Sequence, residues 1–132
     1  MRPPNYRRGC KPIKTTIMKE LKFKFDLDCK FAVYVPSTSD AVNSCDNSEM
    51  VRYVMAELSK LFGGATASRA AGGWMSAEHG LILEEVTIVY AFCTSEQAVA
   101  NFEAVYNICE KIKKDMNQEA VTLEYNGQVK FV

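Results

Sequence analysis

The recurrence of apolar residues at every second position over residues 23–35 limits what this chain can fold into more than any other feature. Every odd position in that stretch is apolar, and the even positions from 22 to 30 are all charged. Successive side chains of a strand point to opposite faces, so the pattern predicts one long strand with a buried face. Such a strand needs a sheet that is covered on one side.

The middle of the chain predicts a helix followed by two strands. Residues 36–44 are rich in Ser, Thr, Asp and Asn, which favours a loop. Asp46 and Glu49 resemble a capping box that opens a helix, and Gly63 and Gly64 end it. Residues 65–74 predict an edge strand, with a turn at residues 78–80 and a stronger strand at residues 81–93.

The last third predicts a second helix and a hairpin. Thr94 and Gln97 form a capping box ahead of apolar residues at helical spacing. Asn126 and Gly127 then suit the positive φ angles of a tight hairpin turn between two short strands.

This order predicts an α+β, ferredoxin-like βαββαβ antiparallel sheet with two helices on one face and a C-terminal hairpin. The other, open face of the sheet is expected to be largely charged, and we predict that it pairs in a homodimer. Its expected members are Lys22, Lys24, Asp26, Asp28, Lys30, Tyr34, Glu85, Thr87 and Val89.

Length and charge predict one domain with a basic extension. Residues 18–132 form the expected domain, and residues 1–17 an extension that is disordered alone, with Met18 favoured over Met1 as the true start. The extension holds five basic residues and no acid, leaving eleven basic against sixteen acidic residues, a net charge of −5, in the rest. An acidic domain argues against nucleic acid as a partner.

Cysteine usage and hydropathy predict a cytoplasmic protein. The five cysteines are widely spaced and include no C-x-x-C pair, which favours free thiols in a reducing compartment, and neither a metal nor a cofactor is expected. Cys93 precedes a helix N-terminus, where the helix dipole lowers a thiol pKa, although ordinary packing is the favoured interpretation. No apolar stretch approaches the roughly 20 residues of a membrane span.

One segment has the composition of a ligand-binding loop. Arg69, Gly72, Gly73 and Trp74 combine a cation, small residues and a large aromatic, which could take an anionic ligand with a ring, and His79 follows in a turn. The competing interpretations are a β-bulge at the glycine pair and a solvated turn histidine. No catalytic residue is expected.

Short runs of the chain resemble small uncharacterised proteins of phages, plasmids and gut bacteria. The runs are residues 34–38 (YVPST), 61–66 (LFGGAT), 73–74 (GW), Gly80 and 84–90 (EEVTIVY). The resemblance implies a ferredoxin-like domain of a mobile element with no assigned activity.

Together these features predict a non-enzymatic binding domain, dimeric through its open face, whose partner is a protein or a small anionic molecule. The expected binding segments are the loop at residues 37–47 and residues 72–74. The alternative is a small enzyme, or a sponge for nucleotides or anionic metabolites, that uses Arg69, Trp74 and His79.

Overall fold

A computed structural model describes residues 21–39 and 43–132, and its α+β fold agrees with a ferredoxin-like arrangement. The expected extension at residues 1–17 lies outside the described residues. The strands are β1 (Cys29–Pro36), β2 (Thr38–Ser39), β3 (Asn43–Ser44), β4 (Thr66–Ser76), β5 (Gly80–Cys93), β6 (Thr122–Tyr125) and β7 (Gln128–Phe131), and the helices are α2 (Ser48–Phe62) and α3 (Ser95–Asp115).

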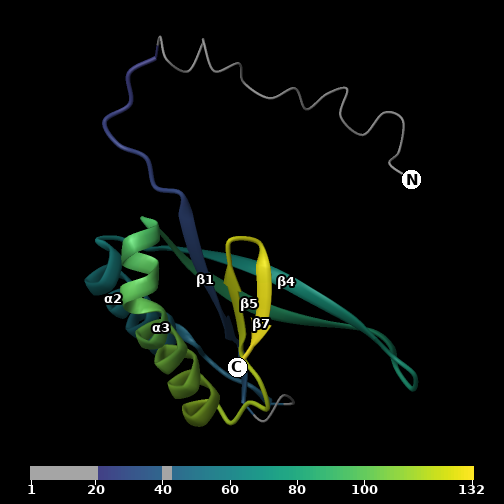
Figure 1. Cartoon of the computed structure of the whole chain (residues 1–132). Helices are drawn as coiled ribbons and strands as arrows, with labels where there is room; N and C mark the ends of the chain where they lie inside the picture. The colour runs from purple at the N-terminus through teal and green to yellow at the C-terminus, as the bar shows by residue number, and fades with distance from the viewer. Residues whose placement is uncertain (1–20, 40–42) are drawn as a thin grey trace, which may run out of the picture.

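The main sheet has five strands in the order β4-β5-β1-β6-β7, and every neighbouring pair is antiparallel. Figure 1 shows α2 and α3 side by side along one face of this sheet. Neither described helix is long and apolar enough to cross a membrane.

The core lies between that sheet face and the two helices. Phe31, at its centre, is fully buried. Its ring centroid lies 5.4 Å from that of Phe62, 5.2 Å from that of Phe102 and 4.7 Å from that of Tyr125. This cluster joins both helices to β1 and β6, and aromatic pairs at such distances contribute beyond the area they bury.

β1 is shorter than the alternation predicted. Strand pairing begins at Cys29, and Phe23 and Phe25 are 61% and 74% exposed. Cys29 lies opposite Cys93, the last residue of β5, so residues before Cys29 have no strand of the sheet beside them. The prediction of one strand over residues 23–35 was wrong at its first half because a strand pattern needs a partner to become a strand.

The two faces of β5 are the reverse of those predicted. Val89 and Thr87 pair with Val33 and Val35 and are buried on the helix side, and Glu85 shares their face. The open face instead carries the even-numbered residues Val86, Ile88, Tyr90 and Phe92. The larger apolar residues therefore lie on the less covered face of this strand, which misled the sequence interpretation.

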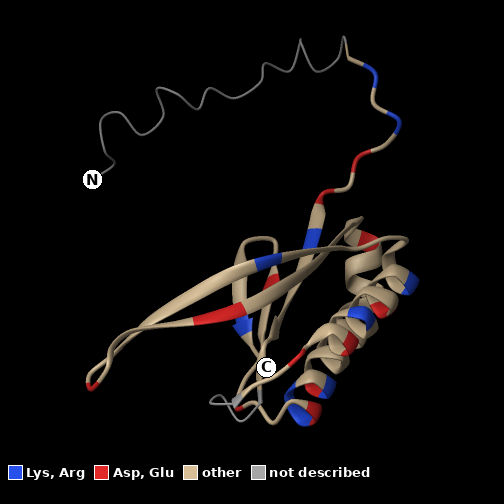
Figure 2. Cartoon of the chain, turned by 180° about the vertical axis from the view of Figure 1, so that it is seen from behind, with Lys and Arg blue, Asp and Glu red and all other residues tan. Residues whose placement is uncertain are grey.

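The β4–β5 hairpin extends beyond the helices as a two-stranded arm, residues 71–85 (Figure 1). Its register runs without a break from Thr66↔Tyr90 to Ser76↔Gly80, so Gly72 and Gly73 make no bulge. Figure 2 shows few charged positions along this hairpin compared with the outer surfaces of the helices.

The predicted end signals are largely confirmed. Gly63 ends α2 with a φ of 91°, and the Thr94–Gln97 capping box of α3 is complete. Asn126 and Gly127, with φ of 49° and 81°, form the turn of the β6–β7 hairpin.

Candidate functional site

A pocket of about 440 Å³ lies where β1 ends and α2 begins. β4 and β5 form its opposite wall. Its polar lining consists of Ser37, Asp46, Asn47, Ser48, Arg69, Glu85 and Thr87. Pockets that take small molecules commonly measure roughly 300–1,000 Å³, so this one has a suitable size.

Asn47 ties together the three elements that meet at the pocket. It is the N-cap residue of α2, and its side-chain Nδ2 donates to the carbonyls of Val35 (3.4 Å) and Pro36 (3.2 Å) and to Thr87 Oγ1 (3.3 Å). Ser37 Oγ adds a hydrogen bond of 2.6 Å to the Glu85 carbonyl. These contacts fix the start of α2 against the ends of β1 and β5.

Asp46 is held in one orientation at the mouth of α2. Its Oδ1 accepts hydrogen bonds from the Ser48 amide at 3.0 Å and the Ser48 hydroxyl at 2.5 Å. These bonds, helped by the charge of Arg69, hold the pKa of the Asp46 carboxyl below its usual value. The predicted capping box at Asp46 and Glu49 is absent, because α2 begins one residue later and Asn47 occupies the cap.

Arg69 comes from β4 and lies opposite Thr87, so it faces the helix side of the sheet. It also lines a second cavity of about 300 Å³, together with Arg52. Asn47, Ser48, Arg69 and Thr87 line both cavities, so the two adjoin, and together they are called the groove.

The groove combines both signs of charge in a small space. Asp46 and Glu85 provide carboxylates, and Arg69 and Arg52 provide guanidinium groups. A guanidinium binds a carboxylate or phosphate through paired hydrogen bonds, and a carboxylate binds a cationic centre. This arrangement suits a ligand that carries both charges. Among residues 21–39 and 43–132, no cluster of His, Cys, Asp and Glu could hold a metal ion.

The structure separates the residues that the sequence proposed for ligand binding. Arg69 lines the pocket, whereas Gly72, Gly73 and Trp74 lie further along the arm. Trp74 points to the opposite face, where its Nε1 donates to Glu84 Oε1 at 3.3 Å. Gly72 and Gly73 are exposed, and a Cβ on Gly73 would meet two leucine side chains at 3.3 Å.

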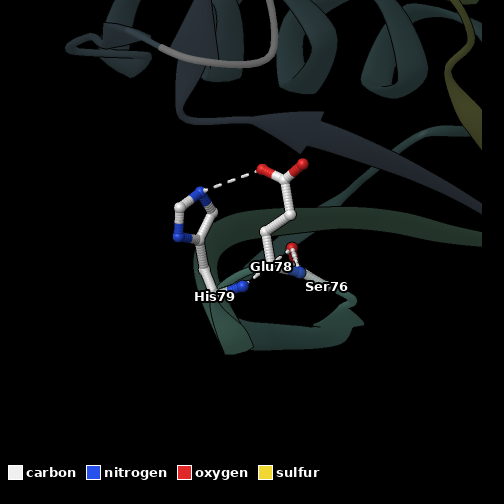
Figure 3. A network of polar contacts seen from close by, with 3 residues as sticks. All are labelled: Ser76, Glu78 and His79. Carbon is white, nitrogen blue, oxygen red and sulfur yellow. Dashed lines mark hydrogen bonds and ion pairs between the residues drawn. The ribbon is translucent and has the colours of Figure 1, made fainter.

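His79 lies at the tip of the arm, far along β5 from the pocket. Its Nε2 is 3.7 Å from Glu78 Oε2, and Ser76 Oγ accepts hydrogen bonds from the backbone amides of Glu78 and His79 (Figure 3). The ring is largely exposed. The five residues thus do not form one site, and a role for those outside the pocket stays a prediction.

Sequence reasoning included Asp46 and Asn47 only as part of a proposed binding loop over residues 37–47, with no role of their own, and it missed Glu85. Glu85 was assigned to the open face because the phase of β5 was read from its larger apolar residues. Asn47 and Asp46 belong to a polar stretch that reads as an ordinary loop and helix start. The signal available in the sequence was the concentration of Ser, Asp and Asn directly before a helix. Only the fold shows that these residues lie across the pocket from Arg69.

The cysteine next to α3 is not activated. Burial raises the pKa of the Cys93 thiol to about 11, and that of Cys109 to about 12. Desolvation therefore outweighs the helix dipole at Cys93.

Comparison with known proteins finds similarity at the level of the fold. No protein-family model matches this chain, and no curated protein matches it. A solved structure of a phage SAM lyase in complex with S-methyl-5′-thioadenosine superposes with a TM-score of 0.58 at 14% identity, covering 84% of this chain and 95% of that chain. A phage SAM lyase in its apo state gives a TM-score of 0.60 at 14% identity, covering 85% and 94%.

These neighbours correct the functional prediction. The sequence favoured a non-enzymatic binding domain that dimerises through its open sheet face, whereas the two solved structures described above, which superpose over nearly their whole length, are of phage SAM lyases. The alternative, a small enzyme, fits this finding better. The phage source of both neighbours is consistent with the phage-related fold that the sequence resemblance implied.

Proposed function

We propose that this chain is an enzyme that cleaves S-adenosylmethionine and releases S-methyl-5′-thioadenosine. The observation that carries the proposal is the groove between α2 and β4, whose paired charges suit this substrate, in a fold shared with phage SAM lyases. S-Adenosylmethionine carries a carboxylate, an ammonium group and a sulfonium, so it needs both cationic and anionic partners.

The residues divide naturally between those charges. Arg69 binds the substrate carboxylate, because its guanidinium matches a carboxylate with two hydrogen bonds. Asp46 stays ionised through the hydrogen bonds from Ser48 and binds the ammonium group. Glu85 lies on the opposite wall and faces the sulfonium.

The reaction breaks the bond between sulfur and the aminobutyrate carbon. An oxygen of the substrate's own carboxylate attacks that carbon and closes a lactone ring, and the electron pair of the broken bond stays on sulfur, which becomes the neutral thioether of S-methyl-5′-thioadenosine. A sulfonium is a good leaving group, so the protein mainly has to orient the substrate and exclude water. Asn47 supports this by holding the start of α2 in place.

The test is product formation from S-adenosylmethionine, measured by liquid chromatography and mass spectrometry. Wild-type protein should release S-methyl-5′-thioadenosine. Arg69→Gln, which loses a charged hydrogen bond to the carboxylate, and Glu85→Gln, which loses a charge–charge contact with the sulfonium, should each lower kcat/KM by about 10- to 150-fold, or roughly 1.5–3 kcal/mol. Glu103→Gln, on the exposed surface of α3, is the matched control and should keep wild-type activity.

Binding of S-adenosylmethionine by calorimetry without any product would contradict an enzyme and favour a metabolite sponge. Equal activity in Glu85→Gln and Glu103→Gln would show that the groove is not the active site.

Two finer expectations from the sequence stand beside this proposal. A cytoplasmic setting is supported by the free thiols of Cys29, Cys45, Cys93 and Cys109 among the described residues. A homodimer remains a proposal as well, and fractionation and light scattering would test the two.

A further inference from the structure

Residues 21–27 have the pattern of a strand but no strand beside them. Leu21, Phe23, Phe25 and Leu27 are all between 41% and 74% exposed. The segment is anchored at its end, where Ser95 Oγ donates to Asp28 Oδ2 at 2.9 Å. It is therefore a piece of chain that is held at one end and exposes aromatic side chains.

β4 is an edge strand that lacks the usual protection. It is eleven residues long, pairs with β5 in an unbroken register, and has no neighbour on its other side in the described sheet. Natural edge strands are commonly blunted by Pro, Lys, bulges or short length, and β4 has none of these features. Its outer edge can accept another strand.

The arm next to that edge exposes apolar side chains on both faces. Trp74 and Met75 on β4 are 51% and 73% exposed, and Leu81 and Leu83 on β5 are 61% and 69% exposed. No helix covers the arm, as Figure 1 shows. Apolar side chains gathered in this way mark an interaction surface.

The charges of the two surfaces are complementary. The arm, residues 71–85, carries Glu78, Glu84 and Glu85 and no Lys or Arg. The segment carries Lys22, Lys24 and one acid, Asp26, and residues 1–20 add six basic residues against a single acid, Glu20.

The segment of one chain does not reach the arm of the same chain by continuing along the sheet. It leaves the sheet at Cys29, opposite Cys93, whereas the arm begins at Glu85, eight residues back along β5. At about 3.3 Å per residue the two are roughly 26 Å apart, and the segment runs away from the arm. A second copy has no such restriction.

We propose that residues 21–27 of one copy add as a strand to the outer edge of β4 in a second copy, with Phe23 and Phe25 against the arm. Main-chain hydrogen bonds then complete the β4 edge, and the aromatic side chains cover the exposed apolar ones. Phe23, Phe25 and Trp74 alone expose roughly 300–400 Å² per copy, taking about 150–250 Å² for each whole side chain and the exposed fractions given above. With the Leu and Met side chains of two copies, the total approaches the roughly 1,200–2,000 Å² of a stable interface.

The experiment is sedimentation equilibrium of the full chain with two variants. Wild type should have the mass of two or more chains. Phe23→Ser/Phe25→Ser should weaken assembly at least about 100-fold, since each Phe loses roughly 1.5–3 kcal/mol of burial, and should keep the wild-type circular dichroism because both side chains lie outside the core. Val99→Ser removes a side chain that is 82% exposed on α3 and should assemble like wild type.

Hydrogen exchange identifies which strands pair. Amides of residues 21–27 and of β4 should be protected together in wild type, and both should lose protection in Phe23→Ser/Phe25→Ser. A monomeric wild type, or unchanged assembly in that variant, would overturn the proposal. Protection of residues 21–27 in a monomer would also overturn it, because the segment would then pair within its own chain. So would a loss of assembly in Met75→Lys but not in Phe23→Ser/Phe25→Ser, because the arms would then pair with each other.

Discussion

Replacing Asn47 with Ala removes the side chain that joins β1, β5 and α2 at the groove. The amide has two N–H donors shared among three acceptors at 3.2–3.4 Å, so at most two full hydrogen bonds are lost. At about 0.5–1.5 kcal/mol each, and with Thr87 left without this donor, Asn47→Ala should lower the free energy of unfolding by about 1–3 kcal/mol. At 2 kcal/mol this corresponds to a decrease in Tm of roughly 6–12 °C.

Urea denaturation followed by circular dichroism measures this loss, with an unchanged m-value showing that the folded state is otherwise the same. Asn107→Ala, at an exposed position of α3, is the matched control and should stay within about 0.5 kcal/mol of wild type. Asn47→Asp should cost at least as much as Asn47→Ala, because it places a carboxylate against two carbonyl oxygens. A stability for Asn47→Ala that equals the Asn107→Ala value would refute this role for Asn47.

Three further outcomes follow from burial and hydrogen bonding. Leu58→Ala, at a fully buried position of α2, should cost about 2–5 kcal/mol in urea denaturation, and a loss below 1 kcal/mol would contradict the packing described. Native Cys93, whose pKa burial raises to about 11, should react with iodoacetamide at pH 7 more slowly than a model thiol, and faster labelling located by mass spectrometry would show an activated thiol. The Asp46 carboxyl has a lowered pKa when folded, so its contribution to stability is present above its unfolded pKa near 3.9 and is lost as pH falls below it. Asp46→Asn should remove that part of the acid dependence of unfolding, and identical pH profiles for the two proteins would contradict it.

The fold was readable from sequence because its signals are local. The Thr94–Gln97 capping box, the left-handed Gly63 and the Asn126-Gly127 turn each act within a few residues, and each lies where it was expected. The length of β1 was not readable, because Phe23 and Phe25 have the right alternation and pairing depends on where β5 ends.

The site was harder to predict because its residues come from separate elements, and the register of the strand pairs decides which of them lie together. Arg69 was singled out from composition, but its relation to Asp46 depends on β4 lying beside β5 with Arg69 opposite Thr87. Glu85 was placed on the wrong face because a buried strand face made of Thr87, Val89 and Ala91 is no more apolar than the open one. On this strand the larger apolar side chains are the less buried ones, so only tertiary packing shows which face is buried.

A crystal structure of the protein with S-methyl-5′-thioadenosine tests the central claim most directly. The account predicts the ligand in the groove at the start of α2, within contact distance of Arg69 and Glu85. Ligand bound elsewhere, or a groove that stays empty at saturating concentration, would contradict it.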